Sequence, residues 1–236
     1  MRMREFKEGI RDGLPICFGY ISVSMAFGLT AVKMGIPLWS AVLISLTNLT
    51  SAGQFAGTTL MAAGGTYLEI AVTSFIINIR YFLMSLSVSQ KVDGEFTMGK
   101  RLITSFGITD EVFAVSMQRR KELSFPYMAG LILTPILGWS GGTLIGAAAT
   151  SLLPASVSDA MGIALYGMFI AIIVPPAREQ KSVMFAVILA IAASCAFAYL
   201  PVLKNVSGGW SVIIVTVVVS GIVAMLFPIK EEEGQA

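Results

Sequence analysis

The chain has 236 residues, of which 56% are hydrophobic and 13% are charged, and its mean hydropathy is +0.81. A soluble domain carries about 25% charged residues. Here the apolar residues form long uninterrupted blocks without the alternation of barrel strands, so lipid is the solvent and helices are the spanning elements. The composition excludes a soluble enzyme and predicts an all-α integral membrane protein, with a single polytopic domain over residues 1–236.

Charge and residue usage exclude further classes of function. The formal net charge is +2, and the basic residues do not gather into a face that would bind nucleic acid. The chain contains no histidine, which removes histidine-based acid–base catalysis and histidine zinc sites. Cys17 and Cys195 both lie in apolar blocks and are interpreted as small core residues. We therefore expect no enzyme activity, no cofactor and no metal site.

Several apolar blocks reach the roughly 20 residues that a spanning helix needs. A polar stretch over 89–124 interrupts them, and within it residues 102–117 are largely apolar. Together these segments predict seven to eight membrane-embedded helices. The apolar blocks cover residues 14–33, 37–63, 67–88, 125–152, 157–177, 180–200 and 209–228.

The distribution of basic residues sets the expected topology. Four basic residues among the first eleven place the N-terminus in the cytoplasm, and the basic residues of 89–124 belong there as well. Three complete spans between them would place 89–124 outside. Either 37–63 is a re-entrant pair of half-helices, or 102–117 is a short polar span that returns the chain. We expect a multi-pass protein of the cytoplasmic (inner) membrane.

Two parts of the chain weakly repeat each other. Residues 28–55 and 146–169 each begin with a glycine, have a proline eight or nine residues later and continue as an apolar helix. Inverted repeats with broken helices are common in secondary transporters. The pattern is consistent with repeats over 10–90 and 122–200, followed by a final helix over 209–228.

Polar and small residues crowd the middle of one apolar block, over 47–59. An unwound helix centre of this kind presents backbone N–H groups to a substrate carboxylate and carbonyl groups to a cation. The alternative is simple helix packing, because Gly53 and Gly57 have small-xxx-small spacing. The candidate substrate-binding residues in this segment are Thr50, Ser51, Gly53, Gln54 and Phe55.

Ionisable groups at membrane depth form a second candidate set. A charge at a helix centre costs about 2.5–3.5 kcal/mol on insertion scales, so each one is expected to face a cavity or a partner. Arg80 with Asp110, Glu111 or Asp159 is predicted to form an internal pair that holds a gate or balances a zwitterionic substrate. The alternatives are a snorkelling Arg80, an Asp159 that caps a helix, and a cytoplasmic loop around 110–111.

The segment Gly138–Gly142 matches the nucleophile pattern G-x-S-x-G. That chemistry needs a histidine base, which the chain lacks. Gly138, Gly142 and Gly146 repeat every four residues, so the segment is interpreted as a close-packing stripe on a helix.

The order of these motifs, spread over residues 6–228, resembles the AzlC family. The resemblance implies the large subunit of a branched-chain amino acid exporter that works with a small AzlD-type membrane subunit. It implies export of valine, leucine, isoleucine and methionine, driven by an ion gradient. The motifs that carry it are Gly13-Leu-Pro15, Ala26-Phe-Gly28, Ser51-Ala-Gly-Gln-Phe55, Asn78-Ile-Arg80, Thr109-Asp-Glu111, and Asp159 with Phe169.

With that substrate, the candidate residues divide by chemistry. Backbone around 50–54 would receive the carboxylate, and Asn78 completes the substrate-binding set. Asp110, Glu111 or Asp159 would take the ammonium group or a proton, while Phe55 and Phe169 would line the apolar pocket. The alternative is an uncoupled channel or pore for a small solute or ion, and a higher oligomer stays open.

Overall fold

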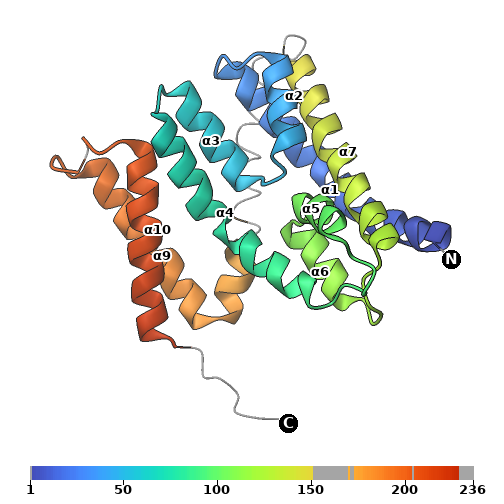
Figure 1. Cartoon of the computed structure of the whole chain (residues 1–236). Coiled ribbons are helices and arrows are strands. Elements are labelled where there is room, and N and C mark those ends of the chain that lie inside the picture. The colour runs from blue at the N-terminus through green and yellow to red at the C-terminus, as the bar shows by residue number, and fades with distance from the viewer. Residues whose placement is uncertain (1, 151–169, 171–172, 204, 229–236) are drawn as a thin grey trace.

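The computed structural model describes residues 2–150, 170, 173–203 and 205–228, and the regular elements of these residues are helices (Figure 1). Within this described part, α1, α4, α7, α9 and α10 are long and apolar enough to cross a membrane. The all-α membrane fold predicted from composition is confirmed. The helices are α1 (Arg2–Lys33), α2 (Leu38–Thr47), α3 (Ala52–Ala62), α4 (Tyr67–Ser89), α5 (Met98–Phe106), α6 (Asp110–Gln118), α7 (Phe125–Ala149), α9 (Lys181–Tyr199) and α10 (Gly208–Leu226); residues 173–179 are also helical.

Helices α1 and α7 form the closest pair, and small residues let their backbones touch. A methyl group on Gly28 would lie 2.2 Å from the carbonyl oxygen of Thr143, and one on Gly146 would lie 2.0 Å from that of Met25. Gly138 and Gly142 face α1 in the same way, which confirms the predicted close-packing stripe.

The polar contacts at one end show how the chain is threaded. Arg2 at the start of α1 pairs with Glu95 at 3.1 Å, and Arg119 pairs with Glu8 at 3.3 Å. The segment between α4 and α7 therefore begins and ends beside the N-terminus. Because Gly9 meets Tyr127 and Gly28 meets Thr143, α1 and α7 run in the same direction away from that end.

Helix α4 must return to the N-terminal side, because α1 leaves it and Glu95 lies there. Helices α2 and α3 consequently enter and leave on the opposite side, as Figure 1 shows, with their inner ends meeting near the middle of the molecule. Residues 37–63 therefore form two half-helices joined by a break, as the re-entrant alternative requires.

The other resolution of the topology was wrong, because residues 102–117 are not one span. They belong to α5 and α6, each of nine residues, and the chain is back at the N-terminal side after both. Gly107 is the C-cap of α5 and packs against Ile132. A methyl group on Gly107 would lie 2.6 Å from the Cβ atom of Ile132. Thr109 then caps α6 by accepting a hydrogen bond from the N–H of Val112 at 3.4 Å.

Of the remaining helices, α10 packs against α4, and α9 packs against α10 (Figure 1). Glu69 in the first turn of α4 accepts hydrogen bonds from the hydroxyl of Ser207 and from the N–H of Gly209, the latter at 3.0 Å, so its carboxylate caps the start of α10. Helix α9 packs on α10 and has no buried side chain within the described residues. The proposed second repeat includes 151–169, outside the described residues, so the repeats stay a prediction.

Candidate functional site

The break between α2 and α3 is the centre of the candidate site. Helix α2 ends at Thr47, Asn48 is extended, and α3 begins at Ala52. Among the described residues Ser51 is the one non-glycine residue with positive φ, at 47°. Such a conformation costs on the order of 1–3 kcal/mol and persists where the surrounding structure imposes it. The predicted unwound helix centre is therefore confirmed.

A cavity of about 820 Å³ opens beside this break. Its walls are mostly apolar and come from α1, the break and α4, while one end is polar and is formed by α4 and the start of α6. Both helix breaks reach it, the first through Leu49 and Ser51 and the second through Thr109. The other lining residues are Pro15, Ile16, Gly19, Tyr20, Val23, Ala52, Ile76, Ile77, Arg80, Tyr81, Asp110, Glu111, Trp139 and Thr216.

The polar end of the cavity holds the predicted internal ion pair. Arg80 Nη2 lies 2.9 Å from Asp110 Oδ2, and the two side chains remain 44% and 40% exposed. Burial raises the pKa of the Asp110 carboxyl above its ordinary value; Arg80 opposes this rise, and the neighbouring Glu111 adds to it. The prediction that Arg80 pairs with one of the acids is confirmed for Asp110.

Tyr20 holds the second carboxylate. Its hydroxyl lies 2.5 Å from Glu111 Oε2 and 2.8 Å from Thr109 Oγ1, so α1 is tied to the start of α6. The ring of Tyr20 packs edge-on against Trp139, with 5.2 Å between centroids. Asp110 and Glu111 are thus adjacent in the chain, but they bind partners on different helices.

Tyr81 connects the ion pair to the helix break. Its hydroxyl donates to the carbonyl oxygen of Thr50 at 3.4 Å, and Arg80 Nη2 approaches the same hydroxyl at 3.4 Å. The guanidinium also lies over the ring of Tyr81, 5.1 Å from its centroid. One side chain, that of Tyr81, therefore links Arg80 to the backbone of the break.

Gln54 and Phe55 lie behind the break and do not line the cavity. Gln54 is 1% exposed and bonds Trp139 and Ser45 through its amide. Phe55 packs edge-on against Phe27, with 5.1 Å between centroids, inside an apolar cluster. Both residues support the break from its buried side.

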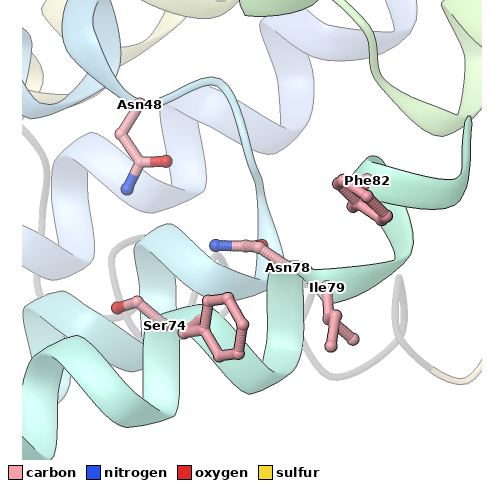
Figure 2. A pocket seen from close by; sticks show the side chains of 6 residues that line it. Asn48, Ser74, Asn78, Ile79 and Phe82 are labelled. Carbon is pink, nitrogen blue, oxygen red and sulfur yellow. The ribbon is translucent and has the colours of Figure 1, made fainter. Parts of the chain in front are cut away.

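A second pocket of about 640 Å³ lies on another side of the break, between Asn48 and α4. Figure 2 shows the polar ends of Asn48, Ser74 and Asn78 pointing into it, with Ile79 and Phe82 further along the helix. Gly53 packs directly on Asn78, since a methyl group at Gly53 would lie 2.5 Å from Nδ2. The predicted Gly53 and Asn78 thus form one contact between α3 and α4.

The structure groups the predicted residues unevenly. Ser51, Arg80, Asp110 and Glu111 share the cavity, while Thr50 contributes its carbonyl through Tyr81. Phe169 and Asp159 lie outside the described residues. Tyr20, Tyr81 and Trp139 also line the cavity and were not predicted from the sequence. Tyr81 directly follows Arg80, and Ile16, Tyr20 and Val23 have helical spacing, which is the signal that could have indicated one cavity-facing stripe.

Comparison with known proteins agrees with this membrane architecture. The family described as AzlC protein matches residues 15–153. The chain is similar to the inner membrane protein YgaZ of Escherichia coli K12, with 31% identity over 75% of each chain. It is also 32% identical to an uncharacterized membrane protein of Archaeoglobus fulgidus, over 72% of this chain and 75% of that protein. No solved structure matches. The chain is therefore a multi-pass membrane protein that belongs to the AzlC family.

Proposed function

We propose that this protein is the large subunit of a secondary transporter that exports valine, leucine, isoleucine and methionine across the cytoplasmic membrane. Family membership supports a role in membrane transport in general. The cavity supports the specific substrate class. Its volume of about 820 Å³ falls within the roughly 300–1,000 Å³ typical of small-molecule sites.

One observation carries the proposal: the cavity has an ion pair at one end and aliphatic walls elsewhere. Ile16, Leu49 and Ile77 present apolar surface to the same space that Arg80 and Asp110 reach. A branched-chain amino acid has the matching division, with a zwitterionic head and an aliphatic side chain. Burial of the side chain contributes roughly 25 cal/mol per Å² of apolar surface removed from water.

The two half-helix pairs suit a gated site. The α2–α3 pair enters from one side and the α5–α6 pair from the other, and the breaks of both reach the cavity. Discontinuous helices of this kind bind substrates and ions at the centre of many secondary transporters. In this proposal, ion coupling falls to the carboxyl groups of Asp110 and Glu111, because the chain contains no histidine.

A small AzlD-type membrane subunit is the partner that the family resemblance implies, and lipid covers the remaining apolar faces. The proposal keeps the N-terminus in the cytoplasm, because the basic residues near it and those of the 89–124 segment share one side.

Export from cells tests the function. Cells that lack endogenous exporters are loaded with leucine-, valine- and methionine-containing dipeptides, with and without this chain and the small subunit. We expect lower internal and higher external amino acid when both proteins are present, and a protonophore should abolish the difference. A channel would be favoured if the flux is downhill and unaffected by the protonophore, and if labelled leucine does not exchange against unlabelled leucine. The absence of any difference, with the protein in the membrane, would reject the proposal.

A further inference from the structure

We propose that the Arg80–Asp110 pair is itself the recognition site for the zwitterionic head of the substrate. The substrate opens the pair: its carboxylate binds Arg80, and its ammonium group binds Asp110. This inference rests on the proposed function and assigns a role to each charged group of the cavity.

The exposure of the pair is the first observation that supports this role. Arg80 and Asp110 are joined by a single 2.9 Å contact through Nη2, and roughly half of each side chain is still open, at 44% and 40%. A guanidinium has five N–H donors in a fork that matches a carboxylate. Arg80 therefore has donors left for a second carboxylate, in the cavity where Asp110 now occupies one of them.

The unequal environment of the two adjacent acids is the second observation. Glu111 is held by the hydroxyl of Tyr20 at 2.5 Å, whereas the ion pair of Asp110 is with Arg80. When a substrate carboxylate takes Arg80, Asp110 loses its cation and the substrate ammonium replaces it. Charges then alternate along the line from Arg80 through the substrate to Asp110, so neither Arg80 nor Asp110 is left without a counter-charge.

The placement of the pair next to the break is the third observation. Arg80 reaches the hydroxyl of Tyr81, and that hydroxyl donates to the carbonyl oxygen of Thr50 in the break. Opening the pair therefore disturbs a hydrogen bond to the unwound segment. This connects occupancy of the polar site to the position of the half-helices.

Trp139 offers a direct probe of occupancy. It lines the cavity against Tyr20, whereas the other two tryptophans, Trp39 and Trp210, are 68% and 41% exposed on the outside of the described structure. The full chain carrying W39F and W210F, purified in detergent, is titrated with three ligands while Trp139 fluorescence is recorded. The ligands are leucine, leucinamide (which lacks the carboxylate) and 4-methylpentanoate (which lacks the ammonium group).

The expected result is a specific pattern across ligands and variants. In the parent protein each analogue should bind about tenfold or more weakly than leucine, a factor that corresponds to roughly 1.4 kcal/mol. In Arg80→Gln, leucine and leucinamide should bind equally, since the carboxylate has lost its partner. In Asp110→Asn, leucine and 4-methylpentanoate should bind equally. Arg80→Lys keeps the charge without the fork and should give an intermediate preference.

Matched controls come from the exposed Arg2–Glu95 pair, which has a similar separation of 3.1 Å. Arg2→Gln and Glu95→Gln make the same changes in charge and should leave all three affinities within twofold of the parent. Melting temperatures of all variants separate loss of binding from loss of folding.

The outcomes separate this inference from the proposed function. If Arg80→Gln and Asp110→Asn weaken all three ligands by the same factor, the pair is only a structural tie and the inference is overturned. Leucine could fail to bind while another α-amino acid shows the same pattern with its own analogues. That result would support the polar site and reject branched-chain amino acid export. If no α-amino acid changes the fluorescence of the folded protein, both are overturned.

Discussion

The indole N–H of Trp139 donates to Oε1 of Gln54 at 2.9 Å, and this contact joins α7 to the first turn of α3. Gln54 Nε2 donates in turn to Ser45 at 2.6 Å, and the Ser45 hydroxyl lies 2.7 Å from that of Thr143. Thr143 donates to the carbonyl of Trp139 at 3.0 Å. Because an indole only donates, the direction of every bond is settled, and Ser45 is the donor to Thr143.

This closed ring predicts that Gln54 is structural. Gln54→Leu removes one acceptor and one donor, so Trp139 and Ser45 lose partners at a buried position, at about 1–3 kcal/mol for each group left unpaired. We expect a clear fall in melting temperature in detergent. Gln90→Leu, at the exposed C-terminal end of α4, is the matched control. Equal melting temperatures for the two variants would show that the ring does not stabilise the break.

The α1–α7 interface should distinguish two neighbouring glycines. A methyl group on Gly142 would lie 2.5 Å from the carbonyl oxygen of Ile21, whereas one on Gly141 would meet nothing within 4 Å. Gly142→Ala must push the helix backbones apart, and overpacking of this kind costs about 1–3 kcal/mol or more. Gly141→Ala should be neutral or slightly stabilising. Thermal melts of both variants test this. A larger loss of stability in Gly141→Ala than in Gly142→Ala would contradict the packing of Gly142 against α1.

The positive φ of Ser51 predicts an unusual order of stabilities. Ser51→Ala removes the hydroxyl but retains the Cβ atom that strains the backbone, while Ser51→Gly removes both. Relief of the strain should make the glycine variant more stable than the alanine variant, by on the order of 1 kcal/mol. Melting temperatures measured side by side check the order. If alanine is the more stable, the strained turn is not held in the folded protein.

Leucine binding should weaken as the pH falls, because a protonated Asp110 no longer attracts the ammonium group. Burial raises the pKa of Asp110, so the loss should begin at a higher pH than for an ordinary aspartate. The ionisable groups around it are Arg80 and Tyr81 on α4, Tyr20 on α1 and the adjacent Glu111. The measurement is the leucine titration of Trp139 fluorescence at several pH values.

Two variants identify the group that titrates. In Asp110→Asn the pH dependence should disappear, while in Glu111→Gln it should remain. If the pH dependence of leucine binding remains in Asp110→Asn and disappears in Glu111→Gln, the group that titrates is Glu111. In this scheme a proton and the ammonium group compete for one carboxyl group. An antiporter that exports an amino acid in exchange for an entering proton needs such competition.

The sequence by itself determined the class of the protein and the place of one helix break, the one between α2 and α3. Apolar blocks without histidine and with little charge exclude soluble enzymes. The crowded segment over 47–59 has weak helix formers, so a break within it, at residues 48–51, follows from local preferences. The stripe of Gly138, Gly142 and Gly146 is likewise a local pattern, and it packs against α1 as its period predicts.

Tertiary structure alone decided which residues share the cavity. Arg80 and Asp110 belong to different helices, and three acids were candidates for one arginine, so no local preference chose between them. The choice follows from the threading, in which both half-helix pairs return to the side they came from and bring their breaks to one cavity. Tyr20, Tyr81 and Trp139 were missed for the same reason. An aromatic residue in an apolar block has the same sequence signal whether it faces lipid, core or cavity, and only packing distinguishes the three.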